Sequence, residues 1–591
     1  MHHPHKDKPL SPARRRFVLG VGASIGMAAL GLTGTPAASA RVRNGSRFDL
    51  TLDYLPVNLT GRAAIATAVD GSLPGPILRW RENDEIALRV TNRLREPSSI
   101  HWHGIVLPAE MDGVPGLSFS GIAPGATFEY RFRLRQHGTY WYHSHSGFQE
   151  QTGLYGAIII DPAGAPRHRA DRDLVVVLSD WSDEEPTAIL ANLRRQSDYY
   201  NANRRTAGDL WHEIRERGVA TTWRERSMWN RMRMSDRDIA DVTGLSYTYL
   251  MNGHPPAQGW TAHFRRGEKL RLRFINAAAM TFFDVRIPGL SMKVIACDGQ
   301  DVEPVTIDEF RLGVAETVDV LVEPHDDTAY TVFAQAMDRS GYARGTLTPD
   351  PALGSVVPAM DPPPVLDHMD MGMASAAHAG HSVHEHGLAP DAADSADDHH
   401  QHHHHPDDSR PAPAGSRWQG DIVHGPRERG VQVDMRTEMP RLRLNDPGPG
   451  LRDNGRRVLT YANLRNAGPT IDPRDPEREI QLHLTGNMHR FLWSVDGIPF
   501  SEAEPLRLRS GERLRVVLVN DTMMSHPIHL HGMWSDLETG DPNHIPRKHT
   551  VVVQPGAVLT HLLTADAPGA WAWHCHLLYH MSGMFREVHV S

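Results

Sequence analysis

The sequence predicts an all-β protein built from three Greek-key β-sandwich domains. Glycine and proline are frequent, with 50 and 43 residues, and few stretches show the apolar spacing of a helix. Three stretches also read alike, each with a turn, an alternating strand and a closing asparagine: NDEIALRVTN (83–92), GEKLRLRFIN (267–276) and GERLRVVLVN (511–520). Short alternating strands between Gly/Pro turns, repeated along a chain, are typical of β-sandwich domains.

A chain of 591 residues is too long for one hydrophobic core, and the repeats divide it. We place the three domains at 41–165, 166–350 and 418–591, with a linker at 351–417. Within the middle domain, residues 184–240 break the β pattern and have helical periodicity. Methionines at 228, 232 and 234 lie close together there. They are either core filler or a docking patch for a soft metal ion.

The N-terminal segment 1–40 has the features of an export signal. Arg14-Arg15-Arg16-Phe17 precedes a short apolar run that ends in small residues at Ala38-Ser39-Ala40. This order is typical of a twin-arginine signal peptide, so we expect the twin-arginine (Tat) machinery to export the chain to the periplasm. No second apolar run is long enough to span a bilayer, so we expect no transmembrane segment in the mature chain.

The net charge argues against a nucleic-acid partner. It is −9 for the whole chain, and without residues 1–40 the chain has 57 basic and 70 acidic residues, a net charge of −13. An acidic surface repels phosphate backbones and mildly favours cations.

The C-terminal stretch WAWHCHLLYHMSGM (571–584) contains one of only two cysteines, with a histidine on each side. Thiolate, imidazole and thioether form a soft ligand set that suits copper, and two histidines, one cysteine and a weak methionine make a blue-copper site. In a strand, His574 and His576 point one way and Cys575 the other. One peptide can therefore hold two metal centres joined through Cys575. The other cysteine, Cys297, we interpret as a small buried hydrophobe.

Four histidine pairs share the spacing i, i+2, so both members of each pair face one way. The spacing repeats: His101 follows Asn92 by nine residues, and His529 follows Asn520 by nine. The middle repeat has Val285 at this position, so we interpret its domain as a spacer without ligands. Eight converging imidazoles suit a three-copper cluster, which leaves His526, Cys575, His580 and Met584 for a separate site. The four pairs are His101/His103, His143/His145, His529/His531 and His574/His576.

These motifs resemble those of a known family. HWHG (101–104), WYHSH (141–145), HPIHLHG (526–532) and HCHLLYH (574–580) are similar to the four copper motifs of multicopper oxidases. AMDRSGYARGTL (336–347) and LHLTGNMHRFLWSVDG (482–497) resemble its copper-resistance protein A branch. The resemblance implies cupredoxin-like domains and a four-electron reduction of O2 to water.

The resemblance also implies a ligand set of four coppers per chain. His526, Cys575 and His580, with Met584 as axial neighbour, would hold the type 1 copper; His101 and His529 the type 2 copper; and His103, His143, His145, His531, His574 and His576 the type 3 pair. In most relatives the axial residue lies ten positions after the cysteine, which here is Phe585, whereas Met584 lies nine after it. Cys575, His574 and His576 would conduct electrons.

Asp112, soon after HWHG, resembles the acid that supplies protons in this family. The other interpretation of Asp112 is a turn-forming aspartate, since it precedes a glycine. Asp536 and Glu538 are weaker candidates for the acid.

The sequence alone does not identify the electron donor. We expect a copper-resistance oxidase of Cu(I), because storage alone does not need an HCH link between two centres. The alternatives are a copper-sequestering protein whose linker binds the ion and a laccase-like phenol oxidase. The linker sequences DHMDMGMASAAHAGHSVHEHG (367–387) and DDHHQHHHHPDD (397–408) are rich in methionine and histidine, which favours extra copper binding. We expect this linker to be mobile. Family analogy adds a possible outer-membrane copper-resistance partner.

Overall fold

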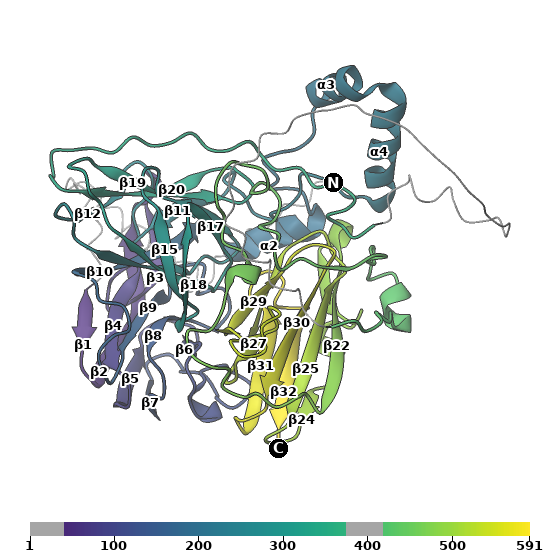
Figure 1. Cartoon of the computed structure of the whole chain (residues 1–591). Coiled ribbons are helices and arrows are strands. Elements are labelled where there is room, and N and C mark those ends of the chain that lie inside the picture. The colour runs from purple at the N-terminus through teal and green to yellow at the C-terminus, as the bar shows by residue number, and fades with distance from the viewer. Residues whose placement is uncertain (1–40, 374–417) are drawn as a thin grey trace, which may run out of the picture. The chain divides into compact units, whose positions relative to one another are not determined.

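The computed structural model describes residues 41–373 and 418–591. The predicted signal peptide and linker residues 374–417 lie outside the described residues. The strands form six sheets, which pair along the chain into three sandwiches (Figure 1). This confirms the all-β fold class with three cupredoxin-like domains.

The first sandwich packs a five-stranded sheet, order β1-β4-β9-β8-β6, on a four-stranded sheet, order β3-β2-β5-β7. A short 3-10 helix, η1 (Ala109–Met111), follows β6. The strands are β1 (Val42–Asn44), β2 (Arg47–Val57), β3 (Ala64–Val69), β4 (Gly75–Arg81), β5 (Glu85–Asn92), β6 (His101–His103), β7 (Thr127–Arg133), β8 (Gly138–His143) and β9 (Tyr155–Asp161).

The middle sandwich has a six-stranded sheet, order β11-β10-β13-β18-β15-β16, and a five-stranded sheet, order β12-β20-β19-β14-β17. Its strands are β10 (Arg172–Trp181), β11 (Thr248–Met251), β12 (Trp260–His263), β13 (Leu270–Asn276), β14 (Phe283–Arg286), β15 (Met292–Cys297), β16 (Gln300–Ile307), β17 (Glu309–Leu312), β18 (Thr317–Val322), β19 (Tyr330–Ala336) and β20 (Tyr342–Thr348).

In the last sandwich, one sheet has the order β23-β22-β25-β30-β27-β28, with β21 also paired to β30, and the other has the order β24-β32-β31-β26-β29. A 3-10 helix, η2 (Pro426–Arg429), precedes the sandwich. The strands are β21 (Arg441–Leu442), β22 (Arg478–Asn487), β23 (Leu492–Val495), β24 (Leu506–Leu508), β25 (Arg513–Asn520), β26 (His526–Leu530), β27 (Ser535–Leu537), β28 (Arg547–Lys548), β29 (Thr550–Val553), β30 (Ala557–Thr564), β31 (Gly569–Cys575) and β32 (Phe585–Val590).

The closing asparagine of each repeat has the same structural role. Asn92, Asn276 and Asn520 end β5, β13 and β25, and each side chain is fully buried. Each Oδ1 accepts a backbone N–H two residues later, at 2.9, 3.0 and 2.9 Å. Each Nδ2 donates to a carbonyl in the turn that follows the strand and to a second carbonyl more than 25 residues along the chain, that of Ile122, Leu312 or Val553. The repeat therefore marks an internal clamp, since buried backbone groups must be paired.

A second shared feature lies in the turn that faces this clamp. The backbone N–H groups of Gly125, Ala315 and Gly556 donate to the carbonyls of the three asparagines at 2.7, 2.9 and 3.1 Å. All three residues have positive φ, at 77°, 71° and 59°. Glycine adopts this conformation freely, whereas alanine does so at a cost. The middle domain has Ala315 in place of this glycine, so its turn does not appear as a Pro-Gly pair in the sequence.

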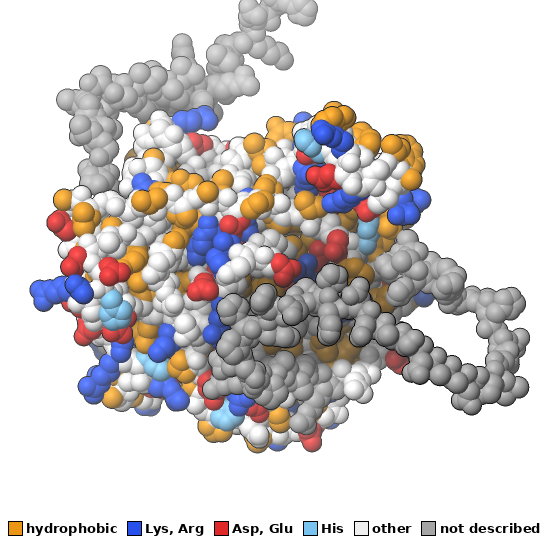
Figure 2. Space-filling view, turned by 45° about the horizontal axis from the view of Figure 1, so that its top comes forward, with side chains coloured by type: hydrophobic (Ala, Val, Ile, Leu, Met, Phe, Trp, Pro, Cys, Tyr) orange, Lys and Arg blue, Asp and Glu red, His pale blue; other side chains and the backbone are white. Residues whose placement is uncertain are grey.

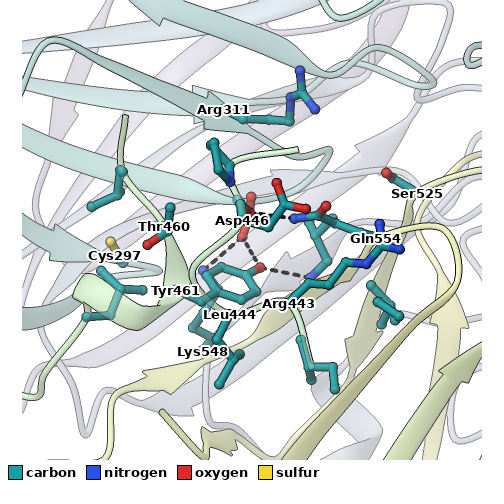
Figure 3. A pocket seen from close by; sticks show the side chains of 18 of the residues that line it. Cys297, Arg311, Arg443, Leu444, Asp446, Thr460, Tyr461, Ser525, Lys548 and Gln554 are labelled. Atoms are coloured by element: carbon teal, nitrogen blue, oxygen red, sulfur yellow. Dashed lines mark hydrogen bonds and ion pairs between the residues drawn. The ribbon is translucent and has the colours of Figure 1, made fainter. Parts of the chain in front are cut away.

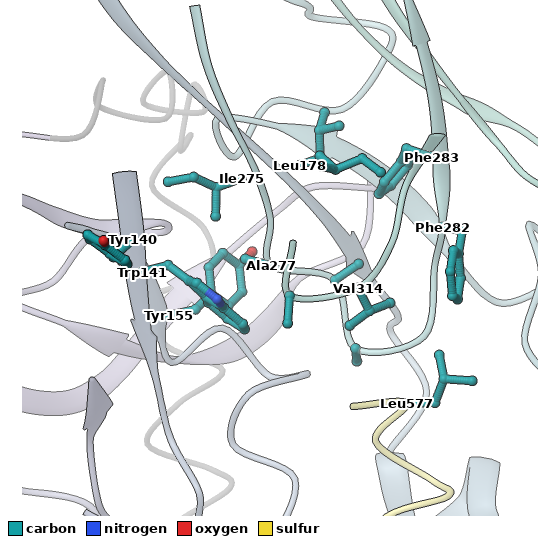
Figure 4. Packing of buried hydrophobic residues seen from close by; sticks show 14 of the residues in the cluster. Tyr140, Trp141, Tyr155, Leu178, Ile275, Ala277, Phe282, Phe283, Val314 and Leu577 are labelled. Carbon is teal, nitrogen blue, oxygen red and sulfur yellow. The ribbon is translucent and has the colours of Figure 1, made fainter. Parts of the chain in front are cut away.

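One hydrophobic core runs through all three sandwiches. Figure 4 shows Tyr140 and Trp141 of the first sandwich near Ile275 and Ala277 of the middle one, with Leu577 of the last sandwich close to Phe282. The backbone N–H of Leu578 also donates to the carbonyl of Ala279 at 3.0 Å. This continuous packing fixes the domains against one another, which a site shared between domains requires.

Three helices interrupt the middle sandwich: α2 (Pro186–Arg195), α3 (Ala207–Arg217) and α4 (Val219–Met232). They confirm the predicted helical insertion, and α3 and α4 stand away from the sheets (Figure 1). Trp211 and Trp223 are exposed there, at 55% and 76%, and hydrophobic and basic side chains share this surface (Figure 2). Within the described residues, none of the helices combines the length and the apolar character that a membrane crossing demands.

The first part of the predicted linker differs from the expected mobile segment. Residues 351–373 pack on the body: Leu366 and Met371 are buried, and the N–H of Leu366 donates to the carbonyl of Asp236 at 2.8 Å. Arg286 and Arg456 bind the carboxylate of Asp361. The composition of this segment gave no sign of these contacts, because a few apolar residues and one charged residue are enough to hold an extended segment on the protein surface.

We expect Asn276→Ala to destabilise the protein by about 2–4 kcal/mol, because several buried backbone groups lose their partner. The measurement is the free energy of unfolding in urea, followed by tryptophan fluorescence. Asn543→Ala is the matched control, since Asn543 is exposed. Equal losses in the two variants would contradict the clamp.

Candidate metal centres

Four short strands place the histidine pairs at the contact between the first and last sandwiches. In the first, β6 lies against β8 with His101 opposite His143. In the last, β26 lies against β31 with His529 opposite His574. The two sandwiches therefore present equivalent pairs of strands to each other, as the repeated spacing predicts.

The eight imidazoles meet across this contact. The ring centroids of His101 and His531 lie 3.9 Å apart, and those of His103 and His529 lie 3.8 Å apart. Their nitrogens form three groups in which all candidate ligand atoms lie within 4.8 Å of one another: His101, His103 and His529; His103, His143 and His576; and His145, His531 and His574. Two of these groups match the composition expected for the two type 3 coppers.

The cluster contains buried imidazole nitrogens without a hydrogen-bond partner in the described structure. Such nitrogens are costly unless something binds them, and a metal ion does so. In His101, His143 and His529 the other ring nitrogen does have a partner, which orients these rings toward the centre. The unpartnered atoms are Nε2 of His101, His143, His145 and His529, and both ring nitrogens of His103 and His576.

The outward partners are mostly backbone carbonyls. Nδ1 of His101 donates to the carbonyl of Asp112 at 2.8 Å, and Nδ1 of His529 donates to that of His549 at 2.6 Å. A ring that donates from Nδ1 presents a bare Nε2, the form that binds a metal.

Two buried acids touch the cluster. The carboxylate of Asp112 accepts from Nδ1 of His531 at 2.8 Å, so the residue contacts rings from both sandwiches. Glu150 Oε2 lies 2.8 Å from Nδ1 of His143, and burial raises the pKa of Glu150 well above its usual value. Sequence reasoning missed Glu150, although it lies five residues after WYHSH. The weaker candidates Asp536 and Glu538 instead form ion pairs with Arg513 and Arg515.

A second centre lies on the other face of β31. Sγ of Cys575 lies 3.4 Å from Nδ1 of His526 and 3.8 Å from Nδ1 of His580, and the two nitrogens are 3.4 Å apart. All three residues are fully buried. Two imidazoles and one thiolate in a triangle are the donor set of a blue-copper site.

Comparisons with known proteins agree with this geometry. Family models described as multicopper oxidase match residues 51–165, 205–351 and 473–591. The chain is 53% identical to the copper resistance protein A homolog of Pseudomonas syringae pv. tomato, over 99% of this chain and 100% of that protein. It is 51% identical to copper resistance protein A of Escherichia coli, over 98% and 100% of the two.

The chain belongs to the multicopper oxidase family. Copper is therefore its cofactor, and it is an oxidoreductase. Among solved structures it is similar to Fet3p, described as a multicopper oxidase that functions in iron import, with a TM-score of 0.61 and 17% identity over 93% of this chain and 91% of that one. It is also similar to a multicopper oxidase of Campylobacter jejuni, with a TM-score of 0.55 and 16% identity over 95% and 94%. At this identity the two structures support the fold alone.

The positions of Met584 and Phe585 bear on which of the two is the expected axial neighbour of His526, Cys575 and His580. Phe585 is the cross-strand partner of His574, and their rings stack at 5.7 Å. Cross-strand partners share one face of a sheet, so Phe585 faces the histidine cluster and not Cys575. Met584 is fully buried, and its carbonyl accepts from the N–H of Cys575 at 3.0 Å.

The middle sandwich also contributes a residue to the surroundings of this centre, beyond the spacer role expected for it. Asp241, between α4 and β11, places Oδ2 2.6 Å from Nε2 of His580. Burial raises the pKa of Asp241 to about 7. Trp493 stacks on the same imidazole at 3.7 Å. No sequence motif distinguishes Asp241, because its role depends on how two domains pack.

A cavity of about 10 Å³ lies next to this carboxylate. Asp241 lines it together with Met280, Met337 and Met524, and each of these three methionines is at least 90% buried. The sequence drew attention instead to Met228, Met232 and Met234; the last two pack in or against the hydrophobic core. The methionines beside the copper site come from three separate loops, so their grouping has no signal in sequence.

A larger cavity, about 90 Å³, lies between the middle and last sandwiches, where Figure 3 shows Cys297, Tyr461 and Lys548. Cys297 is buried and free, as predicted, and burial raises its pKa to about 12. Nζ of Lys548 lies 3.0 Å from carboxylate oxygens of both Asp298 and Glu316. These ion pairs hold Lys548 in place, and Lys548 directly precedes His549. The carbonyl of His549 orients His529, so the wall of the cavity supports the histidine cluster indirectly.

Acid should destabilise the metal-free oxidase. Burial lowers the pKa of His574 to about 4 and that of His103, His143 and His529 well below the usual value. The unfolded chain takes up protons below about pH 6.5, whereas the folded cluster stays neutral. We therefore expect the free energy of unfolding to fall by about 1.4 kcal/mol per pH unit for each such histidine, between about pH 6.5 and 4. Urea unfolding of the metal-free protein at pH 7 and pH 5 measures this loss of stability. Equal unfolding midpoints at the two pH values would contradict the lowered pKa values of these histidines.

Proposed function

We propose that this multicopper oxidase serves copper resistance by oxidising Cu(I) to Cu(II), with O2 as the electron acceptor and water as the product. The observation that supports Cu(I) as donor is the small cavity of Asp241, Met280, Met337 and Met524 beside the type 1 site. Thioethers prefer the soft cuprous ion, and the carboxylate neutralises its charge. The cavity has room for about one water molecule, which also suits a single ion.

We assign four coppers per chain, since the donor atoms in both centres fit the metal. The type 1 ligands would be His526, Cys575 and His580, with Met584 axial; the type 2 ligands His101 and His529; and the type 3 ligands His103, His143, His145, His531, His574 and His576. When bound, these ions accept electrons singly and together reduce O2 by four electrons.

The chain's own residues connect the two centres. Cys575 faces the type 1 site, while its neighbours His574 and His576 face the histidine cluster, so one peptide links them covalently. An electron from the donor would reach the type 1 copper along Asp241 and His580, since Oδ2 of Asp241 lies 2.6 Å from Nε2 of His580. Because His580 is fully buried, the donor does not need to reach the imidazole itself.

Protons must reach the cluster to form water. We assign this task to Asp112, whose Oδ2 accepts from Nδ1 of His531 and whose carbonyl accepts from His101. Glu150, held at Nδ1 of His143, is a second acid on another side of the cluster. Both are almost fully buried, which excludes bulk water around them.

The same features weigh against the two alternatives. A phenol does not fit a cavity of about 10 Å³, so laccase-like activity would need electron transfer over a longer distance. A protein that only sequesters copper does not need a cysteine link between two centres. In this proposal the methionine- and histidine-rich linker is a capture arm that binds extra copper for the oxidase. In the alternative, copper binding by the linker is itself the main function of the protein.

We further propose that the protein works in the periplasm after export by the twin-arginine route, alongside an outer-membrane copper-resistance partner. The twin-arginine sequence at 14–17 supports the route. Relatives named for copper resistance support the setting.

Oxygen uptake with Cu(I) as sole reductant tests the donor. We expect copper-loaded protein to consume one O2 per four Cu(I), and Cys575→Ser to lose at least about 10³ of this rate, because it lacks the link between the centres. Tight binding of many coppers without O2 uptake by the loaded protein would leave sequestration as the function.

Deletion of 374–405 serves as the control for the linker. It spares residues 359–373, which pack on the body, so the fold is retained. A raised apparent KM at an unchanged kcat identifies a capture arm, whereas unchanged kinetics would remove this role.

Met337→Leu tests the donor cavity. We expect the apparent KM for Cu(I) to rise about tenfold, the equivalent of about 1.4 kcal/mol of lost binding, while oxidation of a bulky phenolic dye is unaffected. Met292→Leu is the matched control, because Met292 is equally buried but lies in β15, away from the cavity. The same KM in both variants would contradict the assignment.

A further inference from the structure

A further group of metal-binding side chains lies in the last sandwich, apart from the copper centres. His483 is on β22, Asp521 follows β25, Glu428 is in η2, and His424 precedes η2. Their four candidate ligand atoms all lie within 4.8 Å of one another. Glu428, His483 and Asp521 are almost fully buried, while the side chain of His424 is 19% exposed. The group thus has three fixed members and one near the surface.

The distances fit a small four-coordinate site. Nδ1 of His424 lies 2.7 Å from Oε2 of Glu428 and 3.6 Å from Oδ2 of Asp521. Nδ1 of His483 lies 3.2 Å and 2.8 Å from the same two oxygens. Two ligands of a tetrahedral ion with bonds of about 2.0 Å lie roughly 3.3 Å apart, which falls within this range.

Each carboxylate is held by its other oxygen. Oε1 of Glu428 accepts from the N–H of Gly425 at 2.9 Å, and Oδ1 of Asp521 accepts from the N–H of Thr437 at 2.7 Å. One oxygen of each acid is therefore left to face the imidazoles. Outer hydrogen bonds that orient ligands in this way are characteristic of metal sites.

The imidazoles present the same nitrogen to the centre. Nε2 of His424 donates to the carbonyl of Thr437 at 3.4 Å, a tautomer that leaves Nδ1 bare. Nε2 of His483 points to no partner among the described residues. A bare Nδ1 opposite two carboxylates is repulsive unless a cation lies between them.

We propose that His424, Glu428, His483 and Asp521 bind one divalent first-row transition ion, Cu²⁺ or Zn²⁺, at a site separate from the four coppers. Two carboxylates balance the charge of the ion, and two imidazoles supply ligands of intermediate softness. The set has no sulfur, so it disfavours Cu(I). Cu²⁺ binds more tightly than Zn²⁺ by the usual order of affinities.

The competing arrangement has no metal and two protonated imidazoles paired with two carboxylates. For His483, burial lowers the pKa, but the hydrogen bond that its Nδ1 donates to Asp521 and the charges of nearby acids raise the pKa more. The two arrangements differ in whether one ion occupies the centre, so direct detection of the ion separates them.

The site also touches the type 1 centre through the chain. Asp521 precedes Thr522, whose Oγ1 lies 2.7 Å from Nε2 of His526. An ion that fixes Asp521 therefore also fixes the residue that orients a type 1 ligand.

Anomalous X-ray scattering from crystals of the full-length copper-loaded protein tests the site. Crystals are soaked in Cu²⁺ or in Zn²⁺, and data are collected at each metal's absorption edge. We expect a peak bonded to both Nδ1 atoms and to one oxygen of each acid, from Cu²⁺ at lower concentration than from Zn²⁺. The absence of a peak from either ion, with His–carboxylate hydrogen bonds in its place, would overturn the proposal.

Equilibrium dialysis of the loaded full chain against Cu²⁺ gives a second measurement. His424→Gln should lose one equivalent of Cu²⁺ per chain while the type 1 absorption band is kept, and Glu428→Gln should lose the same equivalent. His589→Gln is the matched control, since His589 also pairs with a carboxylate, at 3.0 Å from Glu587, but has no second imidazole. Equal binding by wild type, His424→Gln and Glu428→Gln would overturn the site.

Discussion

The structure depends on keeping eight imidazoles, seven of them almost fully buried, together in the contact between two domains. Six of the eight rings have an inward nitrogen with no partner among the described residues, and each such atom costs free energy when it leaves water. The remaining architecture offsets this cost. Asparagine clamps close the strands, a continuous core joins the sandwiches, and backbone carbonyls orient the rings. Copper then binds the nitrogens that the fold has left bare, so metal binding and folding are linked.

Much of this arrangement could be predicted from sequence because it is periodic. The i, i+2 spacing decides which histidines share a face, and the repeat decides which pairs are equivalent. Both properties are local to a strand, and the structure follows them at His101, His143, His529 and His574. The same reasoning placed Cys575 on the opposite face from its neighbours, and the positions of both candidate centres agree with it.

Other residues could not be predicted because their positions are set by packing between distant segments. Asp241 reaches His580 only when the middle and last sandwiches meet. Met280, Met337 and Met524 are distant in sequence and ordinary in composition, yet they line one cavity. The middle turn was hidden because Ala315 adopts a conformation typical of glycine, and residues 351–373 dock although their composition resembles a linker. In each case the decisive contact lies outside the local pattern.

The placement of Asp241 has a consequence for how such an enzyme changes over time. The candidate copper ligands lie on strands of the first and last sandwiches or in the loops that directly follow them, whereas Asp241, which contacts His580, comes from a loop of the middle sandwich. Under the proposed function, the residues that reduce O2 and the residues that select the electron donor are thus encoded on different segments of the chain. Exchange of the loop between α4 and β11 alters access to the electron-transfer path and leaves every copper ligand in place. Changes in this loop can therefore give one oxidase a new electron donor during evolution. The same loop is the segment to exchange when such an oxidase is redesigned for another reductant.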